Sequence, residues 1–226
     1  MGLTRIAFAT DIHMSPRIYA WVSRAAKTQD IVLLGGDFAG LPSEGLTMTE
    51  RLVSMAIKAG NIVMVAGNHD FPIYMEERGI LHGTTTQITG LTIGGIGGSL
   101  PVWGPFEVSE SEYELLLKKI GPVDILLSHQ PPYNTECDVL MKGGFHEQHI
   151  GSEVIRRYIE ETQPKLVLCG HIHESVGVDS IGKTTIINPG DFASGNWLEV
   201  RLFVGSERAM EIKFRRLRPL SAAGYT

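Results

Sequence analysis

Leu166-Val167-Leu168-Cys169-Gly170-His171-Ile172-His173 is a short apolar run that ends in a glycine and two histidines. An apolar run of this length that closes with glycine predicts a buried β-strand followed by a turn. On an extended backbone, side chains two residues apart project to the same side, so we expect His171 and His173 to point at one place just beyond the strand. Two nearby histidines alone often make only packing or solvent contacts. The pair indicates a functional site only together with similar residues elsewhere in the chain.

Four further apolar runs end in the same kinds of polar side chain. The runs at 5–10, 30–34, 61–66 and 123–127 lead, in that order, to Asp11 and His13, to Asp37, to Asn68, His69 and Asp70, and to His129. Helix-compatible patterns at 16–27 and 47–59 separate the first three runs. Strand, helix, strand, helix, strand is the signature of right-handed crossovers in a parallel sheet. Because ligands bind at the carboxyl ends of the strands of an open α/β sheet, we expect these side chains to gather at one edge.

The rest of the chain predicts more strands and helices within the same domain. The stretch 84–93 alternates and is rich in Thr and Gly, as hairpin strands are. We expect helices at 110–120 and 151–162, loops at 39–45 and 133–149, and short alternating strands between 176 and 214. Since no linker, repeat or low-complexity segment separates these elements, we predict a single domain over residues 1–215 and a C-terminal tail over 216–226.

Length and composition are those of an ordinary soluble globular protein. Of the 226 residues, 43% are hydrophobic and 20% are charged, which is enough to bury one sizeable core. A net charge of −5 without a long Lys/Arg block argues against a nucleic acid polymer as the partner. No stretch approaches the ~18–20 apolar residues that span a bilayer, and the first residues lack a secretory signal pattern. With Cys137 and Cys169 as the only cysteines, we expect no disulfide framework and a cytoplasmic protein.

The polar residues at the five strand ends form a mixed set of oxygen and nitrogen donors. Two aspartates, one asparagine and four histidines suit divalent Mn, Fe, Zn, Ni or Co better than Ca or Mg alone. Seven candidate ligands are too many for one ion but suit two, and a carboxylate between two ions can bridge them. A single Asp or His after a strand is usually a cap or turn residue. Independent turn chemistry would not place ligand-type residues at all five ends, so we predict a metal centre.

These five blocks resemble the signature of a known family. They are Asp11-x-His13, Gly36-Asp37, Gly67-Asn68-His69-Asp70, Ser128-His129 and Gly170-His171-x-His173. In residue types and order they are similar to the calcineurin-like metallophosphoesterases, over residues 10–173. The resemblance implies an α/β fold, an αββα sandwich of two mixed β-sheets flanked by helices. It also implies a centre of two divalent ions, with manganese favoured.

The resemblance assigns a role to each residue of the blocks. One ion would be held by Asp11, His13 and His173, and the other by Asn68, His129 and His171. Asp37 would bridge the two ions. His69 would face the substrate, where it would stabilise the transition state or protonate the leaving oxygen. The implied reaction is hydrolysis of a phosphate ester by metal-activated water, without a phosphoenzyme.

Two departures from the family pattern reduce the range of expected substrates. Phosphoprotein phosphatases of this superfamily carry Asp and Arg three and four residues after the bridging aspartate, where this chain has Gly40 and Leu41. The phosphate-clamping arginine is therefore missing, and so is the aspartate that would orient His69, for which Asp70 is a candidate. The chain is also too short for the DNA-gripping domain of the repair nucleases. The resemblance that remains is to small prokaryotic-type phosphodiesterases of cyclic nucleotides or small phosphodiesters.

Two other functions stay open from the sequence. One is a phosphomonoesterase, because the choice between ester classes depends on pocket shape. The other is a non-catalytic protein-interaction module on the same fold, such as the retromer subunit that resembles these enzymes and has lost the histidine at the position of His69. The intact His69 and the complete ligand set favour the enzyme. The oligomeric state is left open.

Several residues near the blocks have both a functional and a structural interpretation. His146 and His149 would either contact a substrate phosphate or lie exposed in a loop. Cys169 is expected in the core, and Asn188 and Gly190 are expected to shape a turn near the site. We expect Phe71, Tyr74 and Tyr133 either to form an apolar wall for a base or leaving group or simply to pack.

Overall fold

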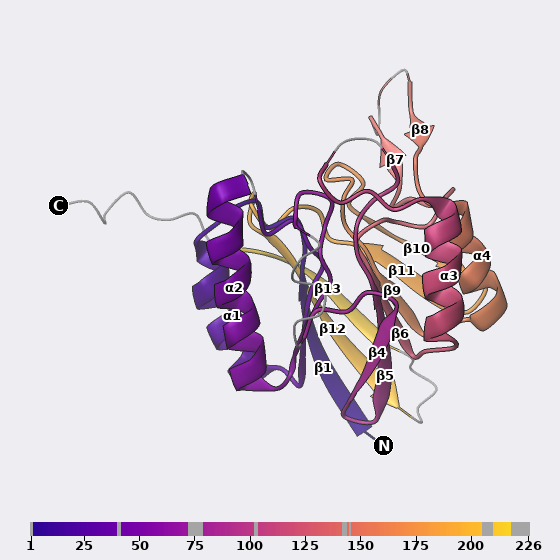
Figure 1. Cartoon of the computed structure of the whole chain (residues 1–226). Coiled ribbons are helices and arrows are strands. Elements are labelled where there is room, and N and C mark those ends of the chain that lie inside the picture. The colour runs from indigo at the N-terminus through magenta and orange to yellow at the C-terminus, as the bar shows by residue number, and fades with distance from the viewer. Residues whose placement is uncertain are drawn as a thin grey trace.

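Two β-sheets packed face to face, with helices on both outer sides, make up the protein (Figure 1). The computed structural model describes residues 2–39, 42–71, 79–101, 104–141, 144, 146–204 and 210–217. The αββα arrangement expected from the family resemblance is confirmed. The predicted tail falls almost entirely on residues 218–226, which lie outside the described residues.

The first sheet contains the strands that lead into three of the five blocks. Its strand order is β13-β12-β1-β2-β3. The parallel strands are β1 (Gly2–Ala9), β2 (Ile31–Leu34) and β3 (Ile62–Met64). β12 (Asn196–Val204) pairs antiparallel with β1, and β13 (Met210–Arg216) pairs antiparallel with β12. The carboxyl ends of β1, β2 and β3 therefore lie at one end of this sheet.

The second sheet contains the strands that lead into the other two blocks. Its order is β10-β11-β9-β6-β5-β4. The four central strands are parallel: β5 (Leu91–Ile96), β6 (Ile125–Ser128), β9 (Leu166–Leu168) and β11 (Thr184–Asn188). The edge strands β4 (Thr84–Ile88) and β10 (Gly177–Ile181) are antiparallel to their neighbours. The hairpin predicted at 84–93 is the β4–β5 pair.

The core between the sheets explains why the strands read as continuous apolar runs. Phe8 and Leu33 from the first sheet and Ile93, Leu127 and Leu168 from the second are fully buried in one cluster. The neighbouring residues of the same strands face the helices and are buried as well. A strand that is covered on both faces carries apolar side chains at every position, without the alternation of a half-exposed strand.

The helices form the two outer layers (Figure 1). α1 (Arg17–Thr28) and α2 (Pro42–Ala59) cover the first sheet, and α3 (Glu110–Ile120) and α4 (Glu153–Thr162) cover the second. In α1 the buried residues Ile18, Trp21, Val22 and Ala25 recur at helical spacing. α3 begins with a capping box between Ser109 and Glu112. No helix in the described ranges is long and apolar enough to cross a membrane.

Two predicted loops are partly regular structure. α2 begins at Pro42, so the loop expected at 39–45 is wrong over most of its length; proline is tolerated in the first turn of a helix, where its missing N–H leaves no bond unmade. The loop expected at 133–149 contains a small antiparallel pair, β7 (Val139–Leu140) and β8 (Gln148–His149). This hairpin rises above the second sheet, beyond the carboxyl end of β9 (Figure 1). Two-residue strands carry too little periodicity to be recognised in sequence.

Candidate metal centre

The seven candidate ligands come from loops that follow strands of both sheets. Asp11, His13, Asp37 and Asn68 follow β1, β2 and β3, and His129, His171 and His173 follow β6 and β9. The expectation of one open sheet is therefore wrong, because the strand ends belong to two sheets that face each other. Backbone hydrogen bonds join the loops: the Asp11 N–H donates to Gly36 O at 3.1 Å and the Gly170 N–H donates to His129 O at 3.1 Å.

One group of ligands consists of Asp11, His13 and His173. The Nε2 atoms of His13 and His173 are 3.1 Å apart, and His173 Nε2 is 3.3 Å from Asp11 Oδ1. The Asp11 carboxylate also accepts hydrogen bonds from the Thr10 hydroxyl at 2.9 Å and from the His171 N–H. The donor atoms of these three side chains lie close enough together to bind one ion.

A second group lies beside the first and contains Asn68, His129 and His171. His129 Nε2 is 3.0 Å from Asn68 Oδ1, and the rings of His129 and His171 have centroids 5.2 Å apart. The other ring nitrogen of His129, Nδ1, is 2.7 Å from Gly35 O. A ring nitrogen that donates to a carbonyl fixes the orientation of the imidazole. His129 thus presents Nε2 to the site.

Asp37 lies between the two groups. Its Oδ2 is 3.7 Å from His13 Nε2 in the first group and 3.6 Å from His129 Nε2 in the second. The same oxygen is 4.0 Å from Nε2 of His69. Its Oδ1 accepts a hydrogen bond from the His69 N–H at 2.9 Å. Asp11, Asp37 and His129 also form a cluster of donors in their own right, so both aspartates lie near the boundary between the groups.

Four of these residues have backbone angles in the left-handed region. The φ angles are 53° at Asp11, 40° at His13, 52° at Asp37 and 69° at His171. Such angles are uncommon outside glycine and often mark functional sites where the surroundings hold a strained backbone. The extended backbone expected at His171 is wrong for this reason. The left-handed turn sends His171 toward His129, while His173 lies beside Asp11 and His13.

The comparison with known proteins agrees with this geometry. Residues 4–175 match the family described as calcineurin-like phosphoesterase. The chain belongs to the calcineurin-like phosphoesterase family. It is 30% identical over 198 residues to the uncharacterized protein MJ1162 of Methanocaldococcus jannaschii, which covers 82% of this chain and 87% of that relative.

Solved structures share the fold of this chain. TT1561 of Thermus thermophilus has a TM-score of 0.66 at 20% identity, over 96% of this chain and 100% of that one. A dimetal phosphatase of Danio rerio has a TM-score of 0.60 at 11% identity, over 94% of this chain and 96% of that one. Members of the family depend on two metal ions, and the Asp and His clusters of this chain have donors that could bind metal.

The electrostatics of the site fit a pair of cations. Burial and the charges of Asp11 and Asp70 raise the pKa of Asp37 well above its usual range. Burial also acts to raise the pKa of Asp11, but the hydrogen bond with His173 and the nearby histidines lower it overall. Buried carboxylates this close together need positive charge for compensation. Divalent ions between Asp11 and Asp37 would supply it.

The histidines are held in the form that binds metal. Burial and the proximity of His129 lower the pKa of His171 to about 3, and burial lowers the pKa of His129 and His13. These imidazoles are therefore neutral at pH 7, and metal binding requires neutral imidazole. His173 differs, because its hydrogen bond with Asp11 raises its pKa.

His69 and Asp70 follow Asn68 but occupy different environments. The His69 ring is partly exposed, and its centroid is 5.4 Å from that of His13. Asp70 is buried and accepts hydrogen bonds from the N–H groups of Gly67 at 2.8 Å and Ala39 at 2.9 Å. Burial raises the pKa of Asp70 to about 6, although these hydrogen bonds act against the rise. These bonds to Asp70 hold the loop after β2 against the loop after β3.

The residues with open interpretations are spread around the site. Asn188 donates from Nδ2 to Ile172 O at 2.9 Å and accepts from the Gly190 N–H at 2.9 Å, so it shapes the turn beside the ligand loop as expected. Cys169 is fully buried, as expected of a core residue. Phe71 is half-buried, and Tyr133 lies at the surface. Tyr74, Gly40 and Leu41 lie outside the described residues.

The two loop histidines are not part of either ligand group. His146 is exposed. His149 is on β8, and its Nδ1 is 2.7 Å from Oδ1 of Asp138, a buried carboxylate that also accepts the N–H groups of Thr135 and Gly151. Asp138 was not predicted, because an aspartate in a loop carries no signal of burial.

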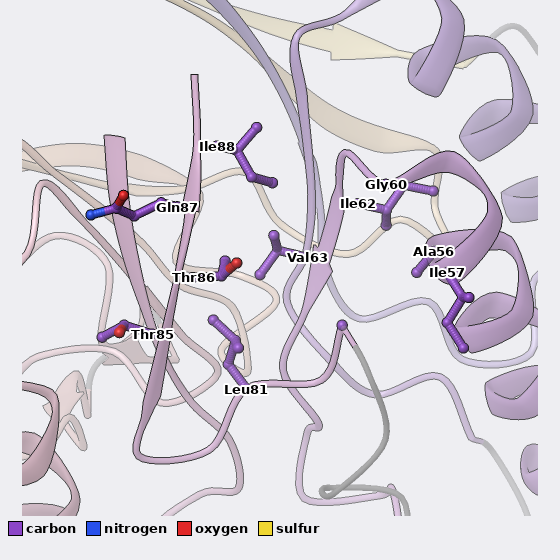
Figure 2. Close-up of a pocket in the computed structure, with 11 residues that line it drawn as sticks. Ala56, Ile57, Gly60, Ile62, Val63, Leu81, Thr85, Thr86, Gln87 and Ile88 are labelled. Carbon is purple, nitrogen blue, oxygen red and sulfur yellow. The ribbon is translucent and has the colours of Figure 1, made fainter. Parts of the chain in front are cut away.

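A pocket of about 410 Å³ lies away from these residues (Figure 2). It lies between the edge strands β3 and β4 and the end of α2. Thr86 and Ile88 of β4 point toward Val63, whereas Gln87 points to the other side of the strand (Figure 2). The described lining of the pocket carries no charged side chain and no histidine. It therefore offers no charged side chain for a phosphate and no carboxylate or imidazole for a metal ion.

Proposed function

We propose that this protein is a dinuclear metal-dependent phosphodiesterase of small phosphodiesters, such as cyclic nucleotides. The observation that carries the proposal is the position of Asp37. Its Oδ2 is within 3.7 Å of Nε2 of a histidine from each ligand group. A carboxylate between two sets of ligands is the arrangement that holds two ions at one reaction centre.

The roles of the side chains follow from the chemistry of phosphoryl transfer. When bound, two divalent ions supply an activated water nucleophile and neutralise the charge of the phosphate. Asp11, His13 and His173 would hold one ion, Asn68, His129 and His171 would hold the other, and Asp37 would be shared between them. His69 does not bind metal, and its partly exposed ring stabilises the transition state or donates a proton to the leaving oxygen.

The preference for a small diester rests on what surrounds the site. The phosphate-clamping arginine of the phosphoprotein phosphatases has Leu41 in its place. Without this clamp, a dianionic monoester loses its main charge partner. The β7–β8 hairpin is tied to the ligand loop, because the Met141 N–H donates to Glu174 Oε1 at 3.0 Å and the Ser175 hydroxyl donates to Val139 O. His149, held by Asp138, and His146 are the hairpin groups that contact the substrate in this proposal.

Hydrolysis of bis-p-nitrophenyl phosphate against p-nitrophenyl phosphate tests the function. The protein is stripped with EDTA and reloaded with Mn²⁺, Ni²⁺, Co²⁺, Zn²⁺ or Mg²⁺. Metal-dependent turnover that favours the diester, with Mn²⁺ among the most effective ions, is the expected result. Cyclic nucleotides are then assayed as substrates.

The same assay separates the alternatives. A preference for the monoester would reassign the protein as a phosphomonoesterase with an unrecognised phosphate clamp. Two bound ions without turnover of either substrate would indicate a non-catalytic interaction module on this fold.

A further inference from the structure

The outer edge of β4 is a sheet edge without the usual protection. β4 is the last strand of the second sheet, and within the described residues it pairs only with β5. Its sequence, Thr-Thr-Thr-Gln-Ile, contains no charged residue and no proline. Exposed edge strands readily pair with strands of other molecules, so proteins usually protect them with charged side chains, proline or a covering segment.

The other edges of the two large sheets have such protection. β13 contains three basic residues. On β10, the carboxylate of Asp179 accepts the Glu136 N–H at 3.0 Å, so a loop lies against that edge. On β3, the Met64 N–H donates to Gly79 O at 2.7 Å, so the segment that contains Gly79 covers the backbone there. Among these edges, as far as the structure describes them, β4 alone is both uncharged and open.

The hairpin turn determines which backbone groups of β4 are free. The strands β4 and β5 are joined by a two-residue turn at 89–90, in which both φ angles are positive. Residues that flank such a turn form a hydrogen-bonded pair, and these pairs alternate along an antiparallel ladder. Every second residue from Ile88 back to Thr84 therefore bonds to β5. The residues between them, Thr85 and Gln87, are exposed and direct their N–H and C=O groups away from β5.

An uncharged pocket lies directly beside this edge. Thr86 and Ile88 point from β4 toward Val63, on the side of the pocket of about 410 Å³ (Figure 2). Ile57, in the last turn of α2, also lines the pocket and is 51% exposed. Because the described lining has no charged side chain, a strand that pairs with β4 would bury no unpaired charge there.

We propose that β4 pairs antiparallel with β4 of a second copy of this chain, so that two six-stranded sheets form one continuous sheet. A second copy fits because the edge is complementary to itself. When the two strands are centred on Thr86, Thr85 of each copy lies opposite Gln87 of the other, and all of their outward N–H and C=O groups pair. The two copies of Thr86 then lie opposite each other, and facing threonines stabilise antiparallel strands.

This pairing places the two candidate metal centres at opposite ends of the joined sheet. Antiparallel pairing of the two β4 strands reverses the direction of every strand in the second copy. The carboxyl ends of β6 and β9, which carry ligands, therefore point in opposite directions in the two copies. Neither copy contributes a residue to the metal centre of the other, so the pairing is independent of the proposed phosphodiesterase function.

Analytical ultracentrifugation of the full chain tests the pairing. Wild type is expected to sediment as a dimer, with twice the 24.8 kDa of one chain, within about 1 to 100 µM, which covers the Kd of small interfaces. Thr85→Pro removes an outward N–H without breaking a bond to β5, and Gln87→Lys adds like charges at the edge. Each is expected to raise the Kd of the dimer by roughly 10-fold or more. Leu115→Lys, at a 68% exposed position on α3, is the charge-matched control and is expected to remain dimeric.

Disulfide cross-linking tests the register. Thr86→Cys places two thiols in a non-hydrogen-bonded pair with Cα atoms about 4.5 Å apart, a distance that a disulfide can bridge. Gln87→Cys is the matched control, because its two thiols are diagonal neighbours with Cα atoms beyond the ~7 Å limit. With diamide as the oxidant, we expect a covalent dimer of Thr86→Cys and a single chain of Gln87→Cys. The native Cys137 and Cys169 are fully buried.

The outcomes separate this proposal from the proposed function. Monomeric wild type would overturn the pairing and leave the edge to an extended segment of another protein. A dimer that both Thr85→Pro and Gln87→Lys leave unchanged, or equal cross-linking through the two cysteine variants, would also overturn it. Diester turnover per chain is expected to be the same in Gln87→Lys as in wild type, so loss of the dimer and failure of the phosphodiesterase assay are distinguishable.

Discussion

At the scale of single residues, close backbone contacts decide where the ligand side chains lie. The loops after β1, β2 and β3 approach each other at glycines, and the side chains of Asp11 and Asp37 fill the space that a Cβ would take. A Cβ on Gly170 would lie 2.4 Å from Asp11 Oδ2, and one on Gly67 would lie 2.0 Å from Asp37 Oδ1. These distances are shorter than any ordinary contact, so the carboxylates can occupy these positions only because residues 67 and 170 are glycines.

Gly67→Ala is expected to displace the Asp37 carboxylate and weaken metal binding by roughly 10-fold or more. The Cβ of alanine cannot be accommodated without moving Asp37, whose Oδ1 also accepts the His69 N–H. Equilibrium dialysis with Mn²⁺ measures the effect. Gly2→Ala, where a Cβ meets nothing within 4 Å, is the control. Unchanged affinity in Gly67→Ala would show that Asp37 is not a ligand.

Asp37→Asn and His69→Ala are expected to separate metal binding from catalysis. Loss of the bridging charge in Asp37→Asn lowers both metal occupancy and turnover. His69→Ala is expected to keep both ions and lose about 10²- to 10⁴-fold in kcat, because it removes a proton donor or transition-state contact. Metal analysis of the purified variants and initial rates with the diester test this. A His69→Ala enzyme of wild-type rate would contradict the role of that residue.

His82 is expected to make stability depend on pH independently of the metal centre. Its Nδ1 accepts the Gly97 N–H at 3.2 Å, and burial lowers its pKa. The unfolded chain therefore binds the proton more readily, so this contribution is complete above pH ~6.5 and declines as the pH falls toward the lowered pKa. His82→Asn keeps an acceptor but cannot be protonated. Urea unfolding at pH 7.5 and 5.5 measures the free energy of unfolding of wild type and variant. The difference in this free energy, wild type minus variant, should be smaller at pH 5.5. An equal difference at both pH values would contradict the role of His82.

At the scale of secondary-structure elements, local signals fix where the helices begin. Ser109 accepts the Glu112 N–H at 3.3 Å, and Glu112 accepts the Ser109 N–H at 2.8 Å. Ser109→Ala removes one half of this capping box and is expected to lower the free energy of unfolding by about 1 kcal/mol. Urea denaturation measures the difference. Ser23→Ala, at an exposed position within α1, is the control, and an equal effect of the two substitutions would argue against capping.

The elements that could be predicted from sequence are those with a strong pattern. α1 and α3 match the predicted ranges within one residue at each end, because their buried positions recur at helical spacing and α3 also begins with a capping box. The apolar strands were also recognised. Their division into two sheets was expected only from the family resemblance; the strand patterns alone could not predict it, since a buried strand has the same apolar sequence in either sheet.

The proximity of the candidate ligands could be predicted, but their local geometry could not. These residues stood out because they follow apolar runs, and the structure brings them together. The left-handed turn at His171 was missed because no glycine or asparagine stands there to signal it. Asp138 was missed because its contacts with Thr135, His149 and Gly151 form within an irregular loop, which has no periodic pattern in the sequence.

At the scale of the whole molecule, the ligand groups join the two sheets. Bound ions stabilise only the folded protein, because the unfolded chain does not hold these side chains together. At free Mn²⁺ about 100-fold above the Kd, the folded state gains about 2.7 kcal/mol. We therefore expect the Tm in Mn²⁺ to exceed the Tm in EDTA by roughly 5–11 °C. Asp37→Asn should lose most of this difference, and a wild-type Tm independent of Mn²⁺ would contradict the site.

The pairing of His13 with His173 has a consequence for the order of folding. These residues are 160 positions apart in the chain, so bringing them together closes a very long loop at an entropic cost. Non-local closure of this kind comes late in folding. The ion held with Asp11 can therefore be captured only after both sheets have docked. In a refolding experiment, the time at which this ion binds would therefore report when the two sheets have docked.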